Sequence, residues 1–372
     1  MTSPRFGIEE EFFLTDLQTL RMVGSPSLRA IEACRAALGA WFATEMFQGQ
    51  IEVASPVFSD FEHASDFLRG SRQALRATLE SFGLGVLSAG SHPLADWREQ
   101  TPTEEEHFQH LFELYGHVAR RSVLSGLHVH VEVGEPLDRI AVMNEVLPWT
   151  PLLLALSCSS PLWDGVASGF MSYRQTACDE WPRMGIPPLF ADQRHYNEHL
   201  AFLTRIGAIT QPAECWWGVR PAARFPTLEL RMTDACPRVA DALTLAAFFR
   251  VLVAHASAQR RPGLLYDQTA RAMLEENRWR AKRWGIHARF LVEGIDGDCS
   301  ITQWLELAEQ RFADTAQALG AAQLFECARA IIASGTSADR QLALLDRASE
   351  QPLDGRSALA QVCELLLQET AG

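Results

Sequence analysis

Three segments of the sequence, residues 5–14, 127–133 and 227–233, place acidic or imidazole side chains at alternate positions. Successive residues of a β-strand point to opposite faces, so each segment read as a strand has one apolar and one polar face. The polar faces carry Glu9, Glu11, His128, His130, Glu132, Glu229 and Arg231. Carboxylate oxygens with a few imidazoles are ligands that Mg²⁺ and Mn²⁺ accept. The spacing therefore predicts a sheet face that binds divalent cations.

Glu10 does not fit this pattern, because it falls on the apolar face of the first segment. A buried carboxylate needs a partner. We expect Glu10 to be paired or to lie at a sheet margin, and we assign it no role in chemistry.

Two further strand-like runs, residues 41–47 and 50–55, are separated by little more than the Gln-Gly pair at 48–49 and predict an antiparallel hairpin. A turn centred on that pair sets Glu45 directly opposite Glu52. Two like charges about 4 Å apart in an effective dielectric of about 20 repel by roughly 4 kcal/mol, so we expect a cation between them. The open alternative is a merely solvated sheet face, although such a face usually mixes lysine, threonine and serine among its acids.

The composition is that of an acidic globular protein. The chain has 372 residues, with 33 Lys or Arg against 46 Asp or Glu, which gives a formal net charge of −13. Nucleic-acid-binding proteins concentrate cations on one face, so no nucleic-acid partner is expected. The single lysine, Lys282, lies in no GxxxxGK[ST] motif, which excludes a Walker-type nucleotide site.

The cysteines and the apolar windows indicate a cytoplasmic protein without a membrane partner. The eight cysteines form no CxxC pair, which fits neither a zinc site nor a disulfide scaffold. The N-terminus lacks the apolar core of a signal peptide. The most apolar windows, residues 148–163 and 243–256, are interrupted by Pro151, Pro161 and Arg250, so neither is expected to span a bilayer.

Strand-like and helical periods interleave in the first 235 residues and predict an α+β fold with one sizeable sheet. The strand-like runs are residues 5–14, 41–47, 50–55, 84–90, 124–133, 214–219 and 225–233. Helices are expected to start at Ser59 and Thr103, which have capping-box spacing to Glu62 and Glu106.

The later sequence contains a long irregular stretch and then only helical patterns. Residues 159–193 read as an ordered loop, which is more often functional than idle, and strand signals vanish from about Arg238 onward. The composition marks no linker near residue 238, and the sequence contains no internal repeat. We expect a single domain, residues 1–372, with a sheet-bearing part at 1–237 and a helical part at 238–372.

Six motifs in order along the chain carry a family resemblance. They are GIEEEF at 7–12, QIEVASP at 50–56, SGLHVHVEV at 125–133, SYR at 172–174, TLELR at 227–231 and ENRWRAKRWG at 276–285. Each motif is weak alone, but together they resemble the type 2 glutamate–cysteine ligases, also called the carboxylate–amine ligase family.

The resemblance implies a fold similar to the catalytic domain of glutamine synthetase, with a curved, mainly antiparallel sheet and helices on its convex face. It also implies that ATP phosphorylates the γ-carboxylate of glutamate and that an amine such as cysteine then displaces the phosphate. The implied cofactors are ATP and Mg²⁺ or Mn²⁺, and a homodimer is possible. The metal-binding residues of the family would fall on Glu9, Glu11, Glu45, Glu52, His128 and Glu229.

Arginines are expected to bind the phosphate or the substrate carboxylate, because planar guanidinium groups suit both. Catalytic roles are predicted for Arg231, Arg174 and Glu229, and nucleotide contacts for Arg220, Arg224, Arg283 and Asn277. For any one arginine, a surface salt bridge is an equal alternative. His130, Tyr173, Trp216, Trp217 and His92 are weaker candidates for the site.

Two other functions remain open from the sequence. Carboxylates and histidines that activate a metal-bound water also serve hydrolases, and such an enzyme would need no ATP. A noncatalytic descendant would bind a nucleotide or metabolite and be stabilised by it without turnover.

Overall fold

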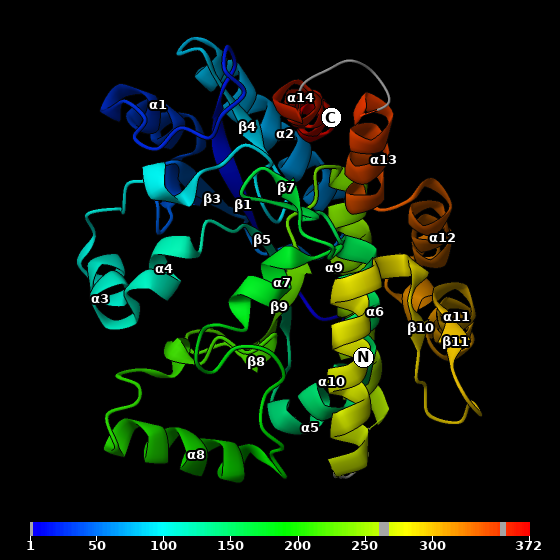
Figure 1. The fold of residues 1–372 in the computed structure, drawn as a ribbon. Helices are drawn as coiled ribbons and strands as arrows, with labels where there is room; N and C mark the ends of the chain where they lie inside the picture. Colours follow the sequence, from blue (N-terminus) through cyan, green and yellow to red (C-terminus); the bar gives the residue numbers. More distant parts are fainter. Residues whose placement is uncertain (1–2, 260–267, 350–354) are drawn as a thin grey trace.

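A computed structural model describes residues 3–259, 268–349 and 355–372. Its main sheet has seven strands in the order β2-β3-β1-β5-β9-β8, with β4 paired to the far end of β1. The strands are β1 (Phe6–Asp16), β2 (Phe42–Thr44), β3 (Gln50–Ala54), β4 (Leu84–Leu87), β5 (Gly126–Glu132), β8 (Val219–Pro221) and β9 (Thr227–Asp234). Every pairing in this sheet is antiparallel. The predicted α+β class with a mainly antiparallel sheet is confirmed, and the sheet is not closed (Figure 1).

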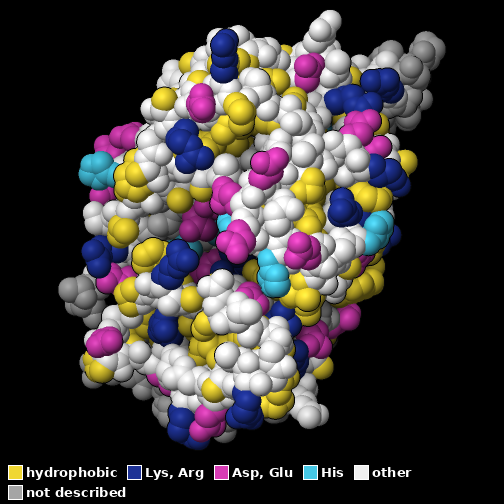
Figure 2. All heavy atoms as spheres, turned by 90° about the vertical axis from the view of Figure 1, so that its left-hand side faces the viewer, with side chains coloured by type: hydrophobic (Ala, Val, Ile, Leu, Met, Phe, Trp, Pro, Cys, Tyr) yellow, Lys and Arg dark blue, Asp and Glu magenta, His cyan; other side chains and the backbone are white. Residues whose placement is uncertain are grey.

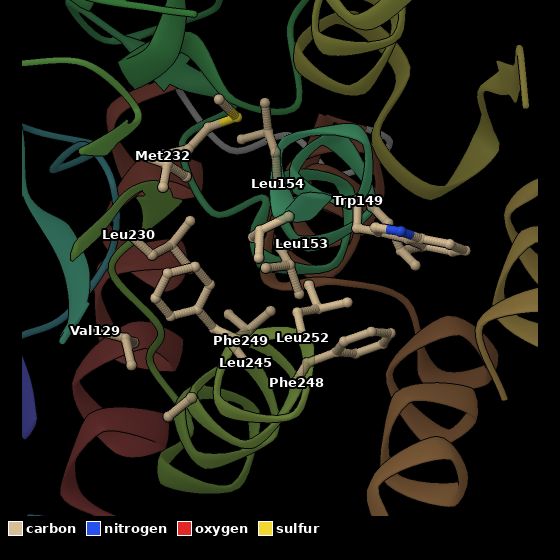
Figure 3. Close-up of a cluster of buried hydrophobic side chains, with 14 of the residues drawn as sticks. Val129, Trp149, Leu153, Leu154, Leu230, Met232, Leu245, Phe248, Phe249 and Leu252 are labelled. Carbon is tan, nitrogen blue, oxygen red and sulfur yellow. The ribbon is translucent and has the colours of Figure 1, made fainter. Parts of the chain in front are cut away.

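One face of the sheet is apolar and is covered by helices. Val129, Leu230 and Met232 point from β5 and β9 toward α6 (Thr150–Ser157) and α9 (Val239–Gln259), as Figure 3 shows. Each fully buried large side chain contributes roughly 1.5–3 kcal/mol. A register slip of one residue would turn the acids into this core, so the packing determines which face carries them.

The remaining helices lie around this core (Figure 1). They are α1 (Leu28–Leu38), α2 (Phe61–Glu80), α3 (Glu106–Tyr115), α4 (His117–Arg121), α5 (Arg139–Val146), α7 (Tyr173–Cys178), α8 (Gln193–Arg205), α10 (Gln268–Trp284), α11 (Ile301–Ala318), α12 (Leu324–Ser334), α13 (Ser337–Ser349) and α14 (Gly355–Ala371). Two small strand pairs are β6 (Leu162–Trp163) with β7 (Val166–Ala167), and β10 (Arg289–Phe290) with β11 (Cys299–Ser300).

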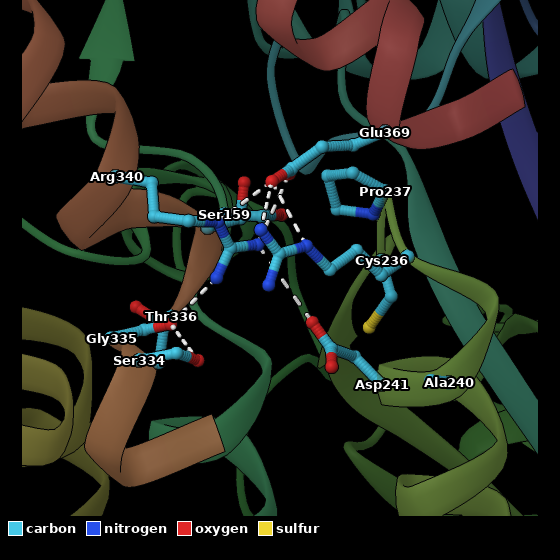
Figure 4. Close-up of polar contacts among 12 residues, drawn as sticks. Ser159, Cys236, Pro237, Ala240, Asp241, Ser334, Gly335, Thr336, Arg340 and Glu369 are labelled. Carbon is cyan, nitrogen blue, oxygen red and sulfur yellow. Dashed lines mark hydrogen bonds and ion pairs between the residues drawn. The ribbon is translucent and has the colours of Figure 1, made fainter. Parts of the chain in front are cut away.

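The last helix returns to the sheet-bearing part of the chain. α14 packs on β4 and α2, and its Glu369 accepts hydrogen bonds from Arg238, just before α9, and from Arg340 of α13 (Figure 4). The two Nε–Oε1 distances are both 2.9 Å. One hydrophobic cluster also contains residues from both parts, in line with the single domain that we predict for residues 1–372.

Several boundaries differ from the sequence prediction. The helix expected at Ser59 starts at Phe61, because Asp60 is the N-cap and its Oδ1 accepts from the His63 amide at 3.0 Å. The strand predicted at 214–219 is instead β8, because Pro212 opens a 3₁₀ turn over Pro212–Glu214.

Three further predictions differ from the structure in detail. The helix expected from Thr103 starts at Glu106, and the Thr103 hydroxyl donates to the Glu45 carbonyl rather than capping the helix. The stretch 159–193 contains β6, β7 and α7, and the C-terminal third contains the β10–β11 pair. Such two-residue strands are too short for a periodic signal.

Two stretches, Arg139–Ser157 and Val239–Gln259, are long and apolar enough to cross a membrane by length and composition. Within their most apolar windows, 83% and 67% of the residues are buried inside the protein. Both stretches contribute to the hydrophobic cluster behind the sheet, so their apolar surface is occupied by the packing of the fold.

Candidate metal and substrate site

The strand register brings the predicted acids and imidazoles together on the face opposite the core. Glu9 of β1 lies opposite His128 of β5, and Glu11 lies opposite Glu52 of β3. Like charges placed directly across an antiparallel pair are destabilising. The Glu11–Glu52 pair therefore calls for a compensating positive charge.

Six side chains form two groups of possible metal ligands. The first group is Glu9, His128 and Glu229, and the second is Glu11, Glu45 and Glu52. Within each group, one ligand atom per residue lies within 4.8 Å of the others. Five carboxylates with one imidazole suit a hard divalent cation such as Mg²⁺ or Mn²⁺ better than zinc, which favours sulfur and nitrogen.

The Nε2 atom of His128 supports this fit. It is buried and makes no hydrogen bond within the described residues, and Glu11 Oε1 lies 3.5 Å away. An unpaired buried nitrogen is costly unless a ligand satisfies it. Opposite His128, the register of β5 and β9 shifts by one residue, a bulge of the kind found beside functional sites.

The predicted pairing of Glu45 with Glu52 is wrong in register. Ala43 lies opposite Glu52, and Glu45 follows the end of β2. The pairing of β2 with β3 ends at Thr44, because the backbone of Met46 and Gln48 pairs with residues 101–103 instead. These backbone hydrogen bonds are 2.9 Å long. The side chain of Glu45 still reaches Glu11 and Glu52, so the convergence survives the register error.

The second group is a strongly acidic pocket. Burial and the nearby Glu11 raise the pKa of Glu45 to about 8. Burial, Glu9 and Glu45 raise the pKa of Glu52 well above its ordinary value. Without a cation, Glu45 therefore holds a proton near neutral pH, and the shift at Glu52 favours the protonated form in the same direction.

The first group has the opposite electrostatics. Burial alone would raise the pKa of Glu229, but Arg231 and Arg220 hold it well below its ordinary value. For His128, burial lowers the pKa, and the positive charge of Arg231 lowers it further. Glu229 is thus ionised and His128 neutral, which are the forms that bind metals.

His130 supports the first group rather than joining it. Its Nε2 lies 3.2 Å from Glu9 Oε1, and its Nδ1 lies 3.1 Å from Thr227 Oγ1. Burial would lower the pKa of His130, but its hydrogen bond to Glu9 and the charge of Glu229 raise it. Such a side chain orients a neighbouring ligand.

Three arginines surround the acids. Arg231 binds Glu229, and Arg220 Nε donates to Glu229 Oε2 at 2.8 Å. Arg174, at the start of α7, donates from Nη1 to the carbonyl of Thr233 at 3.0 Å. Its guanidinium is largely buried and makes no ion pair with any described carboxylate, although its charge acts on Asp234 and lowers the pKa of that carboxyl against the effect of burial.

Two residues that the sequence analysis missed hold Arg174 in place. A Cβ on Gly126 would lie 2.3 Å from Arg174 Nη2, so only glycine leaves room for the guanidinium. Asp234 accepts from the hydroxyls of Ser160 and Ser172, and Ser160 Oγ accepts from the Arg174 amide. The alternation of residues along β9 could have identified Asp234, because it places this acid on the apolar face of the strand. A buried acid on that face needs hydrogen-bond partners.

The second group opens into a cavity of about 240 Å³. Figure 2 shows acidic side chains around this hollow in the molecular surface. Its polar wall contains Glu9, Glu11, Glu45, Gln50, Glu52, His128, Arg174 and Arg231. Glu229 and Arg220 are not among its lining residues; they hold Arg231, which is.

The other candidates lie apart from this cavity. Both polar side-chain atoms of Asn277 bind the backbone of Leu291, and Arg283 donates to the Gly169 carbonyl. Arg224 is exposed in the loop between β8 and β9. Among the weaker candidates, only Trp216 lines the cavity, whereas Trp217 is in the core, Tyr173 stacks on Trp163 and His92 binds Thr15.

The fold is an open antiparallel sheet with helices behind it and an acid-rich, arginine-lined face, and solved ligase structures share this fold. The glutamate–cysteine ligase of Francisella tularensis in complex with AMP matches with a TM-score of 0.74 at 12% identity, over 100% of this chain and 90% of that chain. A bifunctional glutathione synthetase of Pasteurella multocida matches with a TM-score of 0.72 at 17% identity, over 99% of this chain and 52% of that chain. These likenesses show the fold.

The chain belongs to glutamate–cysteine ligase family 2, whose model matches residues 5–363. A Pseudomonas fluorescens protein provisionally named glutamate–cysteine ligase 2 is 55% identical over 364 residues, covering 98% of this chain and 94% of that protein. A protein of the same provisional name from Ectopseudomonas mendocina is 45% identical over 371 residues, covering 100% of this chain and 98% of that protein. Family membership makes this chain an ATP-dependent ligase that joins a carboxylate to an amine, and the resemblance stated from its motifs is confirmed.

Proposed function

We propose that the protein joins the γ-carboxylate of glutamate, or of a similar acid, to an amine such as cysteine, using ATP and Mg²⁺ or Mn²⁺. The observation that carries this proposal is the convergence of five carboxylates and one imidazole from β1, β3, β5, β9 and the β2–β3 connection beside Arg174 and Arg231. Divalent cations supply charge neutralisation between the phosphates of ATP and the acid.

The residues of the site would have three roles: to bind the cations, to bind the transferred phosphoryl group and to position Arg231. Glu9, His128 and Glu229 would hold one cation, and Glu11, Glu45 and Glu52 would hold another. Arg174 and Arg231 line the cavity and would bind oxygens of the transferred phosphoryl group, as bidentate guanidinium groups do. Glu229 and Arg220 would keep Arg231 in position.

The reaction proceeds through an acyl phosphate. A carboxylate oxygen of the acid takes the γ-phosphoryl group, and ADP leaves with the electron pair of the broken P–O bond. The amine nitrogen then forms a bond to the acyl carbon, phosphate leaves with the C–O electron pair, and the amine loses a proton.

We propose fewer residues for contact with the nucleotide than the sequence analysis did. We leave Asn277 and Arg283 out of the site because their polar atoms bind Leu291 and Gly169. Arg224 remains a candidate, since its neighbour Phe225 lies with its ring centroid 6.2 Å from that of His130. We further propose that the protein is cytoplasmic and forms a homodimer. The cytoplasmic location is supported by the eight cysteines, which are all free, as is usual in a reducing compartment.

The test is release of ADP and phosphate from ATP, with Mg²⁺ or Mn²⁺, across pairs of acids and amines. The proposal requires release that depends on both an acid and an amine, and Glu229→Gln should lower it by at least about 10²-fold. Glu132→Gln is the matched control, because Glu132 lies on β5 but pairs with Arg5 outside the cluster. Turnover without ATP would instead favour a hydrolase, and stabilisation by ATP without turnover a noncatalytic binder.

A further inference from the structure

The motif ENRWRAKRWG at 276–285 lies mainly in α10, and none of its residues lines the cavity. α10 runs beside α7 (Figure 1). Two cations of the motif, Arg278 and Lys282, are one turn apart on α10 and are only 8% and 6% exposed. A buried cation needs a partner, and both cations find one at α7.

Both cations bind the C-terminal end of α7. Asp179 is the C-cap residue of this helix, and its Oδ1 accepts from Arg278 Nη2 at 2.7 Å while its Oδ2 accepts from Lys282 Nζ. Arg278 Nη2 also donates to Oε1 of Gln175, inside α7, at 2.9 Å. Burial would raise the pKa of Asp179, but the charges of Arg278 and Lys282 hold it below its ordinary value. The carboxylate is therefore ionised and shared between the two cations.

The backbone of α10 binds the other end of α7. The carbonyl of Lys282 accepts from the amides of Met171 and Ser172, at 2.9 and 3.0 Å. Ser172 is the N-cap residue of α7, and its hydroxyl also donates to Asp234 Oδ1 at 2.8 Å. Lys282 thus holds α7 at both ends, with its carbonyl at the N-cap and its ammonium group at the C-cap.

The orientation of α7 determines where Arg174 points. α7 has six residues, and a helix that short is not stable by itself, so its neighbours fix its orientation. Arg174 and Cys178, one turn apart, line the cavity. Gln175 and Asp179, also one turn apart, lie on the adjacent face and bind α10. A rotation of α7 that broke the contacts with α10 would therefore carry Arg174 away from the cavity.

Stability alone does not account for this arrangement. Desolvation offsets most of the attraction in a buried ion pair, so such pairs add little net stability relative to apolar residues of similar size. Lys282 is also the only lysine among 33 lysine and arginine residues. Its ammonium group is a compact charge that fits beside a carboxylate already bound by one guanidinium, whereas a second planar guanidinium is larger. The two cations are therefore suited to fixing one orientation of α7.

We propose that Arg278 and Lys282 are positioning residues, which hold α7 in the orientation that presents Arg174 to the transferred phosphoryl group. This inference rests on the proposed function, in which Arg174 binds oxygens of that group. It gives the motif at 276–285 a role outside the cavity, because the motif acts through α7. Loss of these contacts leaves the substrates bound but the guanidinium misplaced in the transition state, so it lowers kcat more than it raises KM.

The experiment is a double-mutant cycle on the full chain with ATP, Mn²⁺, glutamate and hydroxylamine. Hydroxylamine takes the place of the amine and traps an acyl phosphate as a hydroxamate, which is measured. We expect Lys282→Met to lower kcat by at least about tenfold and to change the KM for ATP by less than about threefold. In the Arg174→Gln background the same substitution should lower kcat by less than about twofold, because the residue through which Lys282 acts is already gone.

Two further variants complete the cycle. Asp179→Asn removes the carboxylate that both cations share, on a side chain that is 37% exposed, and should reproduce the results of both arms. It tests the inference independently of how well Lys282→Met folds. Arg280→Met is the matched control, because Arg280 lies on α10 but pairs with Glu276 and donates to the Arg289 carbonyl. This control should keep kcat within about twofold of the wild-type value.

The outcomes separate this inference from the proposed function. Unchanged kcat in Lys282→Met, or equal fold losses with and without Arg174, would overturn the inference and leave the proposed function standing. Unchanged kcat in Arg174→Gln would remove Arg174 from the chemistry and overturn the inference, while hydroxamate formation would still support the proposed ligation. Absence of hydroxamate from the wild-type protein with glutamate and similar acids would overturn the proposed function and this inference with it.

Discussion

Glu10 and Arg72 form a buried ion pair on the core side of β1. Their side chains are 2% and 1% exposed, Nη2 and Oε1 are 2.5 Å apart, and Arg72 also donates to the Cys236 carbonyl. Removing one partner of such a pair typically costs about 3–5 kcal/mol, because the remaining charge is buried alone. The expectation that Glu10 would be paired is confirmed.

We therefore predict that Arg72→Met lowers the free energy of unfolding by about 3–5 kcal/mol. Arg76→Met, one turn later on α2, should cost less than about 1 kcal/mol, because its pair with Glu80 is exposed. Urea denaturation of both variants measures the difference. Equal losses would mean that burial of the Glu10 pair does not matter.

The acidic pocket makes stability depend on pH and on metal. The pKa of Glu45 rises from its ordinary value of 4.5 to about 8 in the folded protein. A carboxyl with a raised folded pKa stabilises the protein below its unfolded pKa, and that stability is lost as the pH rises through the folded pKa. Metal-free protein should thus lose stability between about pH 4.5 and 8.

Thermal melting with and without Mn²⁺ checks this prediction. As the pH rises through that range, we expect the melting temperature of the metal-free wild-type protein to fall. The fall should be larger by at least about 2 °C than that of metal-free Glu52→Gln, which lacks one of the two acids. Mn²⁺ should abolish the fall and release protons on binding, measurable by calorimetry in buffers of different ionisation enthalpy. A flat profile for metal-free protein would contradict the raised pKa values.

At the scale of elements, strand parity was predictable and strand register was not. Alternation depends on local geometry, so the polar faces of β1, β5 and β9 were read correctly. The register of β2 depends on residues 101–103, which capture the backbone after Glu45 through distant contacts. The Arg174 site was equally hidden, because Gly126 and Asp234 meet it only in three dimensions.

Gly126 provides a test of how β5 and α7 combine. In Gly126→Ala, the new Cβ would collide with Arg174 Nη2, and we expect kcat/KM for ATP-dependent ligation to fall by about 10²-fold because the guanidinium is displaced. Gly134→Ala is the matched control beyond the end of β5, where a Cβ meets nothing within 4 Å. Similar activity in both variants would remove Arg174 from the proposed chemistry.

At the scale of the molecule, Glu369 ties the end of the described chain to the body that carries the sheet. Its side chain is 8% exposed and binds Arg238 and Arg340. The sequence predicted helices here but not this contact, because residues 238, 340 and 369 share no local pattern. The family motifs end at residue 285, so they gave no information about it either.

We predict that Glu369→Gln lowers the free energy of unfolding by about 1–3 kcal/mol, because two guanidinium groups lose their shared carboxylate. Glu364→Gln changes an exposed acid on the same helix and should have almost no effect. Chemical denaturation of the two variants decides between them. An unchanged midpoint for Glu369→Gln would show that α14 is held by its apolar contacts alone.

The central claim is that acids from distant strands bind cations together on one sheet face. Counting bound Mn²⁺ per chain by electron paramagnetic resonance tests it most directly. The two groups of ligands predict two Mn²⁺ ions per wild-type chain, the loss of one ion in Glu52→Gln, and no loss in the control Glu132→Gln. Unchanged binding in Glu52→Gln, or no bound Mn²⁺ in the wild-type protein, would contradict the account.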